Sequence, residues 1–337
     1  MGGIAGIVDL AGGKRATRAA LAAMLEPLKV RGPDSSGIYT DGTAGLAQAQ
    51  LVTIATEAVG LLSNATGSIQ AVYSGEIFNY LELRERLQAC GHRLAQSGDG
   101  AVIVPLYQEY GDEFVHQLNG QFAIALWDRA RRRLLLVRDQ PGIVPLHYAE
   151  RDGRLLFGSE VKALLPLFSH APELDPVALD QLFTFWAPRT PRTMFRGVQQ
   201  LLPGEMLIVE DGRLQRRRYW DWSFPSARGE YASAPPERLA DELRDHLAEA
   251  VRLRSRAQKP VGAYLSGGLD SSALVALLKQ QTGSAPHTFS IRFDDSELDE
   301  SAYQQRMVDF AGSRHSFVQC GYSDIVARLP ETIWRTE

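Results

Sequence analysis

The stretch that most constrains how this 337-residue chain can fold is residues 261–278, which read VGAYLSGGLDSSALVALL. The apolar run at 261–265 is typical of a strand, and the apolar spacing at 270–278 is typical of a helix. Ser266, Gly267 and Gly268 join the two segments. Glycines let a ligand approach the backbone closely, and the first N–H groups and the dipole of a helix attract anions. This order of segments therefore predicts an anion-binding turn.

The side chains of the turn refine this prediction. Ser266, Ser271 and Ser272 add hydroxyl donors, whereas Asp270 would repel a phosphate unless it also held a bridging divalent cation. The alternative is an ordinary strand-to-helix turn in which Asp270 or Ser271 caps the helix. The string is not a Walker loop, because no Gly-Lys-Ser/Thr follows. It resembles the pyrophosphate loop of the ATP pyrophosphatases, which split ATP to AMP and pyrophosphate, and we favour a nucleotide site over a plain turn.

Composition argues against several other classes of protein. The net charge of −4 gives no basic excess that would favour nucleic acid, and the arginine triplets at 131–133 and 216–218 lie beside strand-like runs where solvation is expected. Cys90 and Cys320 lack metal-ligand spacing, which fits a reducing compartment. No apolar run reaches membrane-spanning length, and no signal peptide is evident. We expect a cytoplasmic protein that binds neither nucleic acid nor membrane.

Two patterns of secondary structure divide the chain. The first half alternates strand-like runs with a few helices, which predicts an α+β domain; its expected helices lie at 16–29, 80–89, 101–110, 159–165 and 175–185. A hairpin around 211–212 and a Pro- and Ser-rich stretch at 223–236 follow. Beyond these, helices and strands alternate, which favours an α/β domain with a parallel sheet. We therefore predict domains over residues 1–205 and 236–337, with a hairpin and linker over 206–235.

Taken in order, the motifs of the chain resemble those of glutamine-dependent asparagine synthetase and its relatives. The matching stretches are GIAGI (3–7), RGPD (31–34), GEIFN (75–79), RD (138–139), GSEVK (158–162), FRGV (195–198), LPG (202–204), SGGLDSS (266–272) and TFSI (288–291). The resemblance implies an αββα sandwich like that of the N-terminal-nucleophile hydrolases, followed by a parallel-sheet ATP pyrophosphatase domain that is truncated here. It also implies a reaction in which ATP adenylates a carboxylate and ammonia displaces AMP to form an amide.

The glutaminase residues of this family are where the chain departs from the resemblance. Its cysteine nucleophile, directly after the initiator methionine, is Gly2 here, which has no side chain with which to attack. The arginine expected to hold the glutamine carboxylate is Gln50, and the asparagine of the oxyanion turn is Ser74. Asp99 remains, but its acidic partner is Ala101. We therefore expect no intact glutaminase site and no glutamine hydrolysis.

Four other family residues remain in the first half, and we interpret them as structural: Arg31, Gly75, Glu76 and Asp139. For Arg31 we expect an ion pair with Asp34 or Asp139.

The second half keeps the nucleotide signals of the family. The resemblance implies that Leu265 and Ile291 flank the adenine and that Asp270 binds Mg²⁺. It further implies that phosphates are held by Ser266, Gly267, Gly268, Leu269, Asp270, Ser271 and Ser272. Leu265 and Ile291 end strands, so both are equally compatible with a core role. The acidic cluster at 294–300 suggests a metal, but we favour a solvated loop in which Asp299 caps the next helix.

Two functional hypotheses follow. The first is an ATP-dependent, AMP-forming amide-bond ligase with an inactive glutaminase half. It would act on a small-molecule or peptide carboxylate, with ammonia or a substrate amine as nucleophile, as the β-lactam synthetases and lasso-peptide cyclases that it resembles do. The alternative is a non-catalytic or partner-dependent scaffold that binds nucleotide only. The family continues past residue 337 with a second acidic loop for Mg²⁺, so a fragment, a partner chain or second copy, and a pseudoenzyme all stay open.

Overall fold

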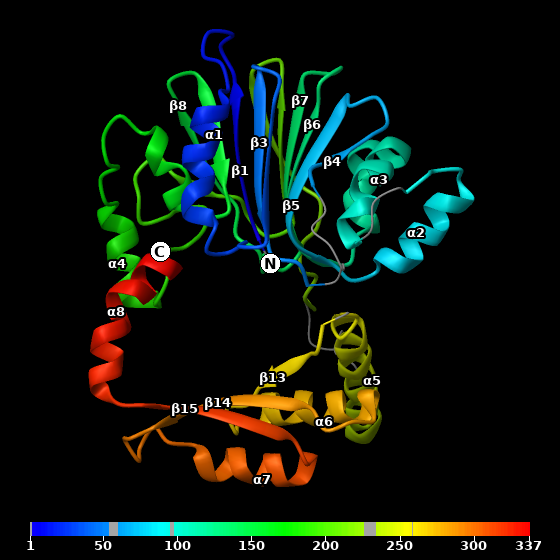
Figure 1. Ribbon diagram of the computed structural model, residues 1–337, viewed down its shortest axis with the longest axis vertical. Coiled ribbons are helices and arrows are strands. Elements are labelled where there is room, and N and C mark those ends of the chain that lie inside the picture. The colour runs from blue at the N-terminus through cyan, green and yellow to red at the C-terminus, as the bar shows by residue number, and fades with distance from the viewer. Residues whose placement is uncertain (1, 54–59, 95–97, 226–233, 258) are drawn as a thin grey trace. The chain divides into compact units, whose positions relative to one another are not determined.

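The structure is a computed structural model that describes residues 2–53, 60–94, 98–225, 234–257 and 259–337 (Figure 1). The chain forms two compact units, Met1–Ser223 and Phe224–Glu337.

The first unit contains two six-stranded antiparallel sheets. The first sheet has the order β10-β8-β9-β1-β3-β2, formed by β1 (Gly3–Asp9), β2 (Ser35–Thr40), β3 (Ala44–Gln50), β8 (His147–Arg151), β9 (Arg154–Gly158) and β10 (Gln199–Gln200). The second has the order β12-β11-β7-β6-β5-β4, formed by β4 (Leu62–Ser63), β5 (Ile69–Ile77), β6 (Gly120–Asp128), β7 (Arg133–Arg138), β11 (Glu205–Glu210) and β12 (Arg213–Arg218).

Helices cover the outer faces of both sheets (Figure 1). The helix α1 (Arg18–Leu25) buries Leu21 and Met24 against the first sheet. The helices α2 (Tyr80–Ala89) and α3 (Ile103–Tyr110) pack Leu83 and Leu106 against the second. A further apolar cluster, including Leu46 and Trp127, lies between the sheets. The unit is therefore an αββα sandwich, as expected.

Strand β6 shows how its sequence places it at the centre of this sandwich. Alternate residues of a strand point to opposite faces. Ala123, Ala125 and Trp127 belong to the cluster between the sheets, while Ile124 and Leu126 belong to the cluster under α2 and α3. Because both faces are covered, the strand is a nearly continuous apolar run.

Two segments of the first unit differ from the sequence-based expectation. The hairpin that we assigned to the region between the domains pairs with β7 through β11, so the compact unit extends to Ser223. The expected helix at 159–165 is replaced by two 3-10 turns, Val161–Ala163 and Leu165–Leu167. Pro166 lacks an N–H group and disfavours helical backbone in the residue before it, which accounts for the broken pattern. The described part of this unit also contains the helix α4 (Pro176–Phe185).

The second unit carries a parallel sheet with the order β13-β14-β15, as the alternating pattern predicts. Its described elements are α5 (Pro236–Arg254), β13 (Gly262–Tyr264), α6 (Leu269–Thr282), β14 (His287–Phe293), α7 (Ser301–Ala311), β15 (Arg314–Cys320) and α8 (Tyr322–Thr336). Part of the expected linker, residues 226–233, lies outside the described residues.

One face of this parallel sheet is covered and the other is open. Leu265 packs with Val275 of α6 and Ala311 of α7, which places both helices on the same face. On the opposite face, Tyr264 and Ile291 are 88% and 54% exposed. The described part of the unit thus has a small core on one side of the sheet only.

Within the described residues, every helix is too short or too polar to cross a membrane.

Candidate functional site

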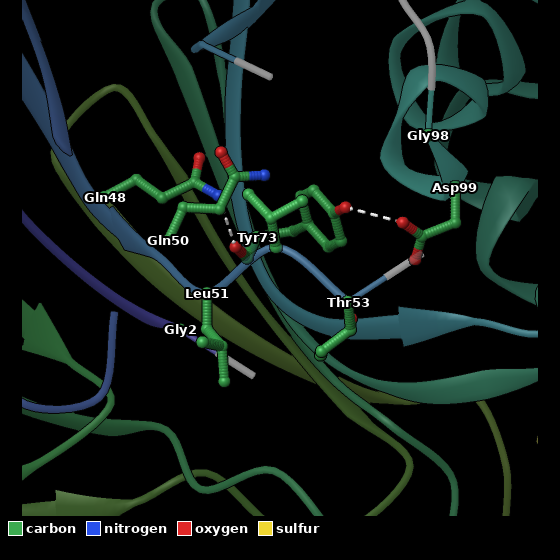
Figure 2. A pocket seen from close by; sticks show the side chains of 10 residues that line it. Gly2, Gln48, Gln50, Leu51, Thr53, Tyr73, Gly98 and Asp99 are labelled. Carbon is green, nitrogen blue, oxygen red and sulfur yellow. Dashed lines mark hydrogen bonds between the residues drawn. The ribbon is translucent and has the colours of Figure 1, made fainter. Parts of the chain in front are cut away.

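The positions that correspond to the family's glutaminase site meet in a small pocket of the first unit (Figure 2). Gly2 precedes β1, Gln48 and Gln50 come from β3, Tyr73 comes from β5, and Asp99 lies in a 3-10 turn before α3. The free volume of the pocket is about 20 Å³, which is room for roughly one water molecule. The structure therefore brings Gly2, Gln50 and Asp99 together around this pocket but leaves little space between them, whereas Ser74 and Ala101 do not line it.

Gly2 is buried and crowded by backbone. A Cβ atom built on it would lie 2.1 Å from the carbonyl oxygen of Ala49, a separation that real side chains do not show. The Gly2 carbonyl accepts hydrogen bonds from Arg31 Nε at 3.0 Å and from Ser74 Oγ at 2.8 Å. The nucleophile position is therefore both bare and fixed in place, and the Ser74 hydroxyl is already engaged with the main chain.

Asp99 is also engaged inside the protein. Its carboxylate accepts hydrogen bonds from the Tyr73 hydroxyl at 2.8 Å and from the backbone N–H of Ile77 at 2.7 Å, and only 4% of the residue is exposed. Burial raises the pKa of the Asp99 carboxyl and raises that of the Tyr73 hydroxyl well above its ordinary value. Both groups therefore favour their protonated forms more than exposed ones would. Ala101, at the position of the second acidic residue, is buried.

Gln50, at the position of the family's arginine, lines the pocket without supplying a charge. Its Oε1 atom accepts a hydrogen bond from Ser35 Oγ at 3.3 Å. The neighbouring Gln48 donates its amide to the Tyr73 carbonyl at 2.9 Å (Figure 2). The described walls of the pocket thus offer amides and a hydroxyl where the family has a cation.

The prediction that Arg31 forms an ion pair with Asp34 or Asp139 was wrong. The guanidinium pairs with Glu160 at 2.8 Å, and Lys162 lies 2.7 Å from the same carboxylate. Asp34 instead accepts the backbone N–H of Val52, and Asp139 accepts backbone N–H groups that include those of Ile143 and Val144. Glu160 lies 129 residues from Arg31 in sequence, so the tertiary packing of the chain determines this ion pair.

Two residues of this pocket were missed by sequence reasoning. Tyr73 packs on the backbone of Gly100, where an added Cβ would lie 2.2 Å from the ring. Gln48 is buried and spans from β3 to the Tyr73 carbonyl of β5. Neither lies inside a motif that marks a function, so the residue order gave no signal for either.

The second candidate site is the turn between β13 and α6. Gly267 has a φ of 93°, a left-handed value that favours glycine, and it packs against the first turn of α7. The N-cap of α6 is Gly268, which has no side chain to cap the helix and whose own N–H donates to Ser266 Oγ at 3.3 Å. The alternative cap by Asp270 or Ser271 was therefore wrong, and in the described part of the chain no capping side chain covers the first N–H groups of α6.

Hydrogen bonds between Ser266 and Ser271 hold the serine hydroxyls of this turn in position. Ser266 Oγ and Ser271 Oγ lie 3.0 Å apart, and the Ser266 backbone N–H donates to Ser271 Oγ at 3.2 Å. Ser272 is half-buried in the first turn of α6. The arrangement holds hydroxyls and open N–H groups at the C-terminal end of a parallel strand, where ligands of open α/β sheets bind.

The apolar members of the predicted nucleotide set differ in their surroundings. Leu265 is 1% exposed and its side chain belongs to the core. Leu269 is 85% exposed and Ile291 is 54% exposed, so both present apolar surface to solvent at the end of the sheet. The structure therefore gives Leu265 a packing role, with only its backbone available beside the turn.

Asp270 is an exposed carboxylate, and the described structure gives it no hydrogen bond or ion pair. No group of three or more His, Cys, Asp or Glu side chains in the described part of the chain could hold a metal ion. In the acidic loop, Asp294 and Asp295 bond to Gln319 and Tyr322, and the N-cap of α7 is Glu300. Our expectation that Asp299 caps that helix was wrong.

Comparison with known proteins identifies the family. Residues 1–220 match the family model of the glutamine amidotransferase domain, and residues 242–337 match that of asparagine synthase. The chain is 32% identical over 325 residues to the amidase chyE of Penicillium rubens, covering 91% of this chain and 47% of that protein. It is 29% identical over 351 residues to the glutamine-hydrolyzing asparagine synthetase 3 of Bacillus subtilis, covering 99% of this chain and 56% of that protein.

The chain spans about half the length of these curated relatives. Among solved structures, it is similar to a glutamine phosphoribosylpyrophosphate amidotransferase of B. subtilis, with a TM-score of 0.48 and 15% identity over 94% of this chain and 81% of that one. By the two family matches, the chain belongs to the glutamine amidotransferase domain family, joined to a segment of the asparagine synthase family.

Proposed function

We propose that this chain belongs to an ATP-dependent, AMP-forming amide ligase whose nucleotide site is the turn at residues 266–272 and whose glutaminase half is inactive. The observation that carries the proposal is the turn itself. A left-handed glycine, paired serine hydroxyls and uncapped helix N–H groups meet at the C-terminal end of β13. Such a turn is suited to bind a polyphosphate.

The residues present fit ATP with Mg²⁺. A Cβ built on Gly268 would meet only Ser266 Oγ, at 3.4 Å, so the space above the helix N-terminus is open. Mg²⁺ is commonly held by one or two carboxylates together with substrate phosphates. The exposed carboxylate of Asp270 in the first turn of α6 would supply such a ligand. When bound, the ion would offset the repulsion between this carboxylate and the phosphates.

The proposed reaction has two steps. A substrate carboxylate attacks the α-phosphate of ATP, which forms an acyl-adenylate and releases pyrophosphate. An amine or ammonia then attacks the acyl carbon, which forms the amide and releases AMP and a proton. In this scheme the turn at 266–272 orients the phosphates, and its fixed N–H groups and hydroxyls favour the charge that develops on the leaving pyrophosphate.

We further propose that glutamine is not the nitrogen source. This rests on four features of the pocket: the bare and crowded Gly2, the engaged Ser74, the neutral Gln50 and the internal bonding of Asp99. A working thiol, carboxylate clamp and oxyanion donor would each need a different residue or a different position. Free ammonia or an amine on the substrate is then the nucleophile.

The ligase proposal is tested with the full chain. ATP binding is measured by calorimetry with and without Mg²⁺, and pyrophosphate and AMP release are followed with aspartate plus ammonium and with carboxylates that carry their own amine. We expect binding that Mg²⁺ tightens and release that depends on a carboxylate. Binding without release for any carboxylate would favour the nucleotide-binding scaffold instead. No binding at millimolar ATP would refute the nucleotide site.

The proposal for the first unit is tested separately by glutamate release from glutamine, with and without ATP and the carboxylate. We expect none above the spontaneous rate. Release at the rate of a working glutaminase would sink this part of the proposal and leave the nucleotide site untouched.

A further inference from the structure

A buried amide from α7 connects two strand ends beside the turn. Gln304 is 2% exposed, and its Nε2 atom donates to the Ile291 carbonyl at 3.0 Å and, over a longer distance of 3.4 Å, to the Ser266 carbonyl. Ile291 lies near the end of β14, and Ser266 is the first residue of the SGGLDSS string. A single side chain thus contacts both segments that border the proposed nucleotide site.

These two carbonyls lie beyond the ordinary pairing of the strands. The register of β13 with β14 ends at Tyr264 and Phe289. Past that pair, the described structure ties the two backbones together through the Leu265 N–H donating to Phe289 and through the Ser290 hydroxyl donating to the Leu265 carbonyl. The Gln304 amide continues this connection to Ser266 and Ile291, where the two strand ends separate.

The turn also rests directly on α7. A Cβ built on Gly267 would lie 3.0 Å from Tyr303 Cβ and 3.1 Å from the Gln304 backbone nitrogen. The glycine therefore allows the turn to approach the helix closely enough for the Gln304 side chain to reach the Ser266 carbonyl.

We propose that Gln304 is a positioning residue for the nucleotide: its amide fixes the separation and orientation of the Ser266 and Ile291 backbones, the two strand ends that border the proposed nucleotide site. The ligand in this statement rests on the proposed function, whereas the bracing of the turn does not. Gln304 has no place in the proposed reaction itself, so it acts only through the backbone that it holds.

The chemistry of the amide distinguishes bracing from simple space filling. Carbonyl oxygens only accept hydrogen bonds, so the NH₂ end of the amide must face Ser266 and Ile291, and its two hydrogens suit two acceptors. The Oε1 atom is consequently buried, with no hydrogen-bond partner in the described structure. An orphaned buried acceptor is unfavourable, so a residue that only filled space would be better replaced by an apolar one of similar size.

The test compares three variants of the full chain. Gln304→Met keeps the length of the side chain and removes both donors. Gln304→Asn keeps an amide but is one methylene shorter, which guards against a failure of the Met variant to fold. Gln305→Met is the matched control, because Gln305 lies next in α7 but is exposed, and it bonds to the side chains of Asp309 and Arg292 and not to the Ser266 or Ile291 carbonyl.

Hydrogen exchange of peptides over residues 262–272 is measured first, without nucleotide. We expect Gln304→Met and Gln304→Asn to speed exchange there by about fivefold, the effect of losing one net hydrogen bond, and Gln305→Met to leave it unchanged. The dissociation constant for ATP with Mg²⁺ should rise by a similar factor in the first two variants only.

If neither Gln304 variant changes the exchange rate in the turn, the proposal is overturned and Gln304 only fills space in the core. If exchange in the turn rises but the dissociation constant for ATP does not, then Gln304 stabilises the turn without affecting the nucleotide. That result would refute its positioning role. If the unaltered chain binds no ATP, the proposed function fails, and the exchange comparison still decides whether Gln304 braces the turn.

Discussion

At the scale of single residues, the pocket around Gly2 shows how closely neighbouring groups pack around a residue that has no side chain. The carbonyl oxygen of Ala49 lies 2.1 Å from where a Cβ on Gly2 would be, and the Gly2 carbonyl accepts hydrogen bonds from Arg31 and Ser74. A nucleophile could not be added here without moving β1 or β3.

A first prediction concerns this crowding. Gly2→Cys should not restore glutamine hydrolysis and should destabilise the first unit by about 1–3 kcal/mol, the usual cost of overpacking. Gly13→Cys is the control, because a Cβ on Gly13 meets nothing within 4 Å. Urea unfolding and glutamate release measure the two effects. A Gly2→Cys variant that is as stable as the control, or that hydrolyses glutamine, contradicts the structural explanation.

A second prediction concerns Asp270. Asp270→Asn should weaken binding of ATP with Mg²⁺ by about tenfold or more and change binding of ATP alone very little, because the carboxylate is proposed to serve the ion. The free energy of unfolding should change by less than about 1 kcal/mol, the size of an exposed carboxylate's interaction with a helix N-terminus.

The control for this variant is Asp309→Asn, which removes an equal charge from the exposed face of α7. Titration calorimetry with and without Mg²⁺ separates the two forms of ATP. Equal weakening in both conditions, or in both variants, would mean that Asp270 does not bind the ion.

At the scale of elements, charged and polar residues connect strand β8, which lies between β10 and β9, to the N-terminal strand β1. Ser159 exchanges hydrogen bonds with Ile4 of β1, and His147 Nδ1 of β8 lies 3.2 Å from the Ser159 carbonyl. Arg31 and Glu160 form an ion pair in the same region. The GSEVK motif at 158–162, here called the β1 clamp, thus holds β1 in place through hydrogen bonds of Ser159 and the ion pair of Glu160.

The pH dependence of this clamp gives a third prediction. Burial lowers the pKa of His147 to about 4, and the nearby positive charges of Arg138 and Arg31 act in the same direction. Between about pH 4 and the ordinary value of 6.5, the unfolded chain binds a proton at His147 that the native chain does not. The free energy of unfolding therefore keeps its full value, as far as His147 is concerned, above pH 6.5. It falls by on the order of 3 kcal/mol as the pH is lowered toward 4.

The measurement is urea unfolding of the first unit at several values between pH 4 and 7. His147→Gln should flatten the dependence, because it removes the titrating group and keeps a donor. His170→Gln, at an exposed histidine, should retain the slope of the unaltered chain. Identical slopes for all three proteins would exclude His147 as the source.

At the scale of the whole molecule, the two units differ in how much apolar surface they bury. The first unit has three buried clusters, above, between and below its sheets. In the described part of the second unit, the buried cluster consists of Leu265, Val275 and Ala311, with Ala263, Met307 and Val308 partly buried around it. Burial of apolar area is the main favourable term in folding, so the second unit should open at lower free energy.

A fourth prediction follows from this difference. Peptides from β13, α6 and β14 should exchange their amide hydrogens before peptides from β5, β6 and β7. Saturating ATP with Mg²⁺ should slow exchange in the former and leave the latter unchanged, because a ligand stabilises the unit that binds it. Mass spectrometry after timed labelling measures both sets. A common exchange rate without nucleotide, or protection in β6 as well, would contradict this picture.

The sequence alone determined the class of each unit, because hydrophobic periodicity and the order of motifs are local properties. Periodicity predicted the strand–turn–helix at 261–278, and the family resemblance carried by the motifs implied the αββα sandwich and pointed to Gly2 as the position of the family's nucleophile. The boundary at the hairpin was less accessible, since β11 joins β7 only through tertiary pairing.

Tertiary structure alone decided which groups meet. The pairing of Arg31 with Glu160, the bonding of Asp99 to Tyr73 and the bridge of Gln304 to Ser266 join residues 129, 26 and 38 positions apart. Such contacts depend on how sheets and helices stack, and several carboxylates or carbonyls along the chain could have served each donor equally well. Local sequence patterns specify which elements form, whereas only the packed chain specifies which side chains lie within hydrogen-bonding distance.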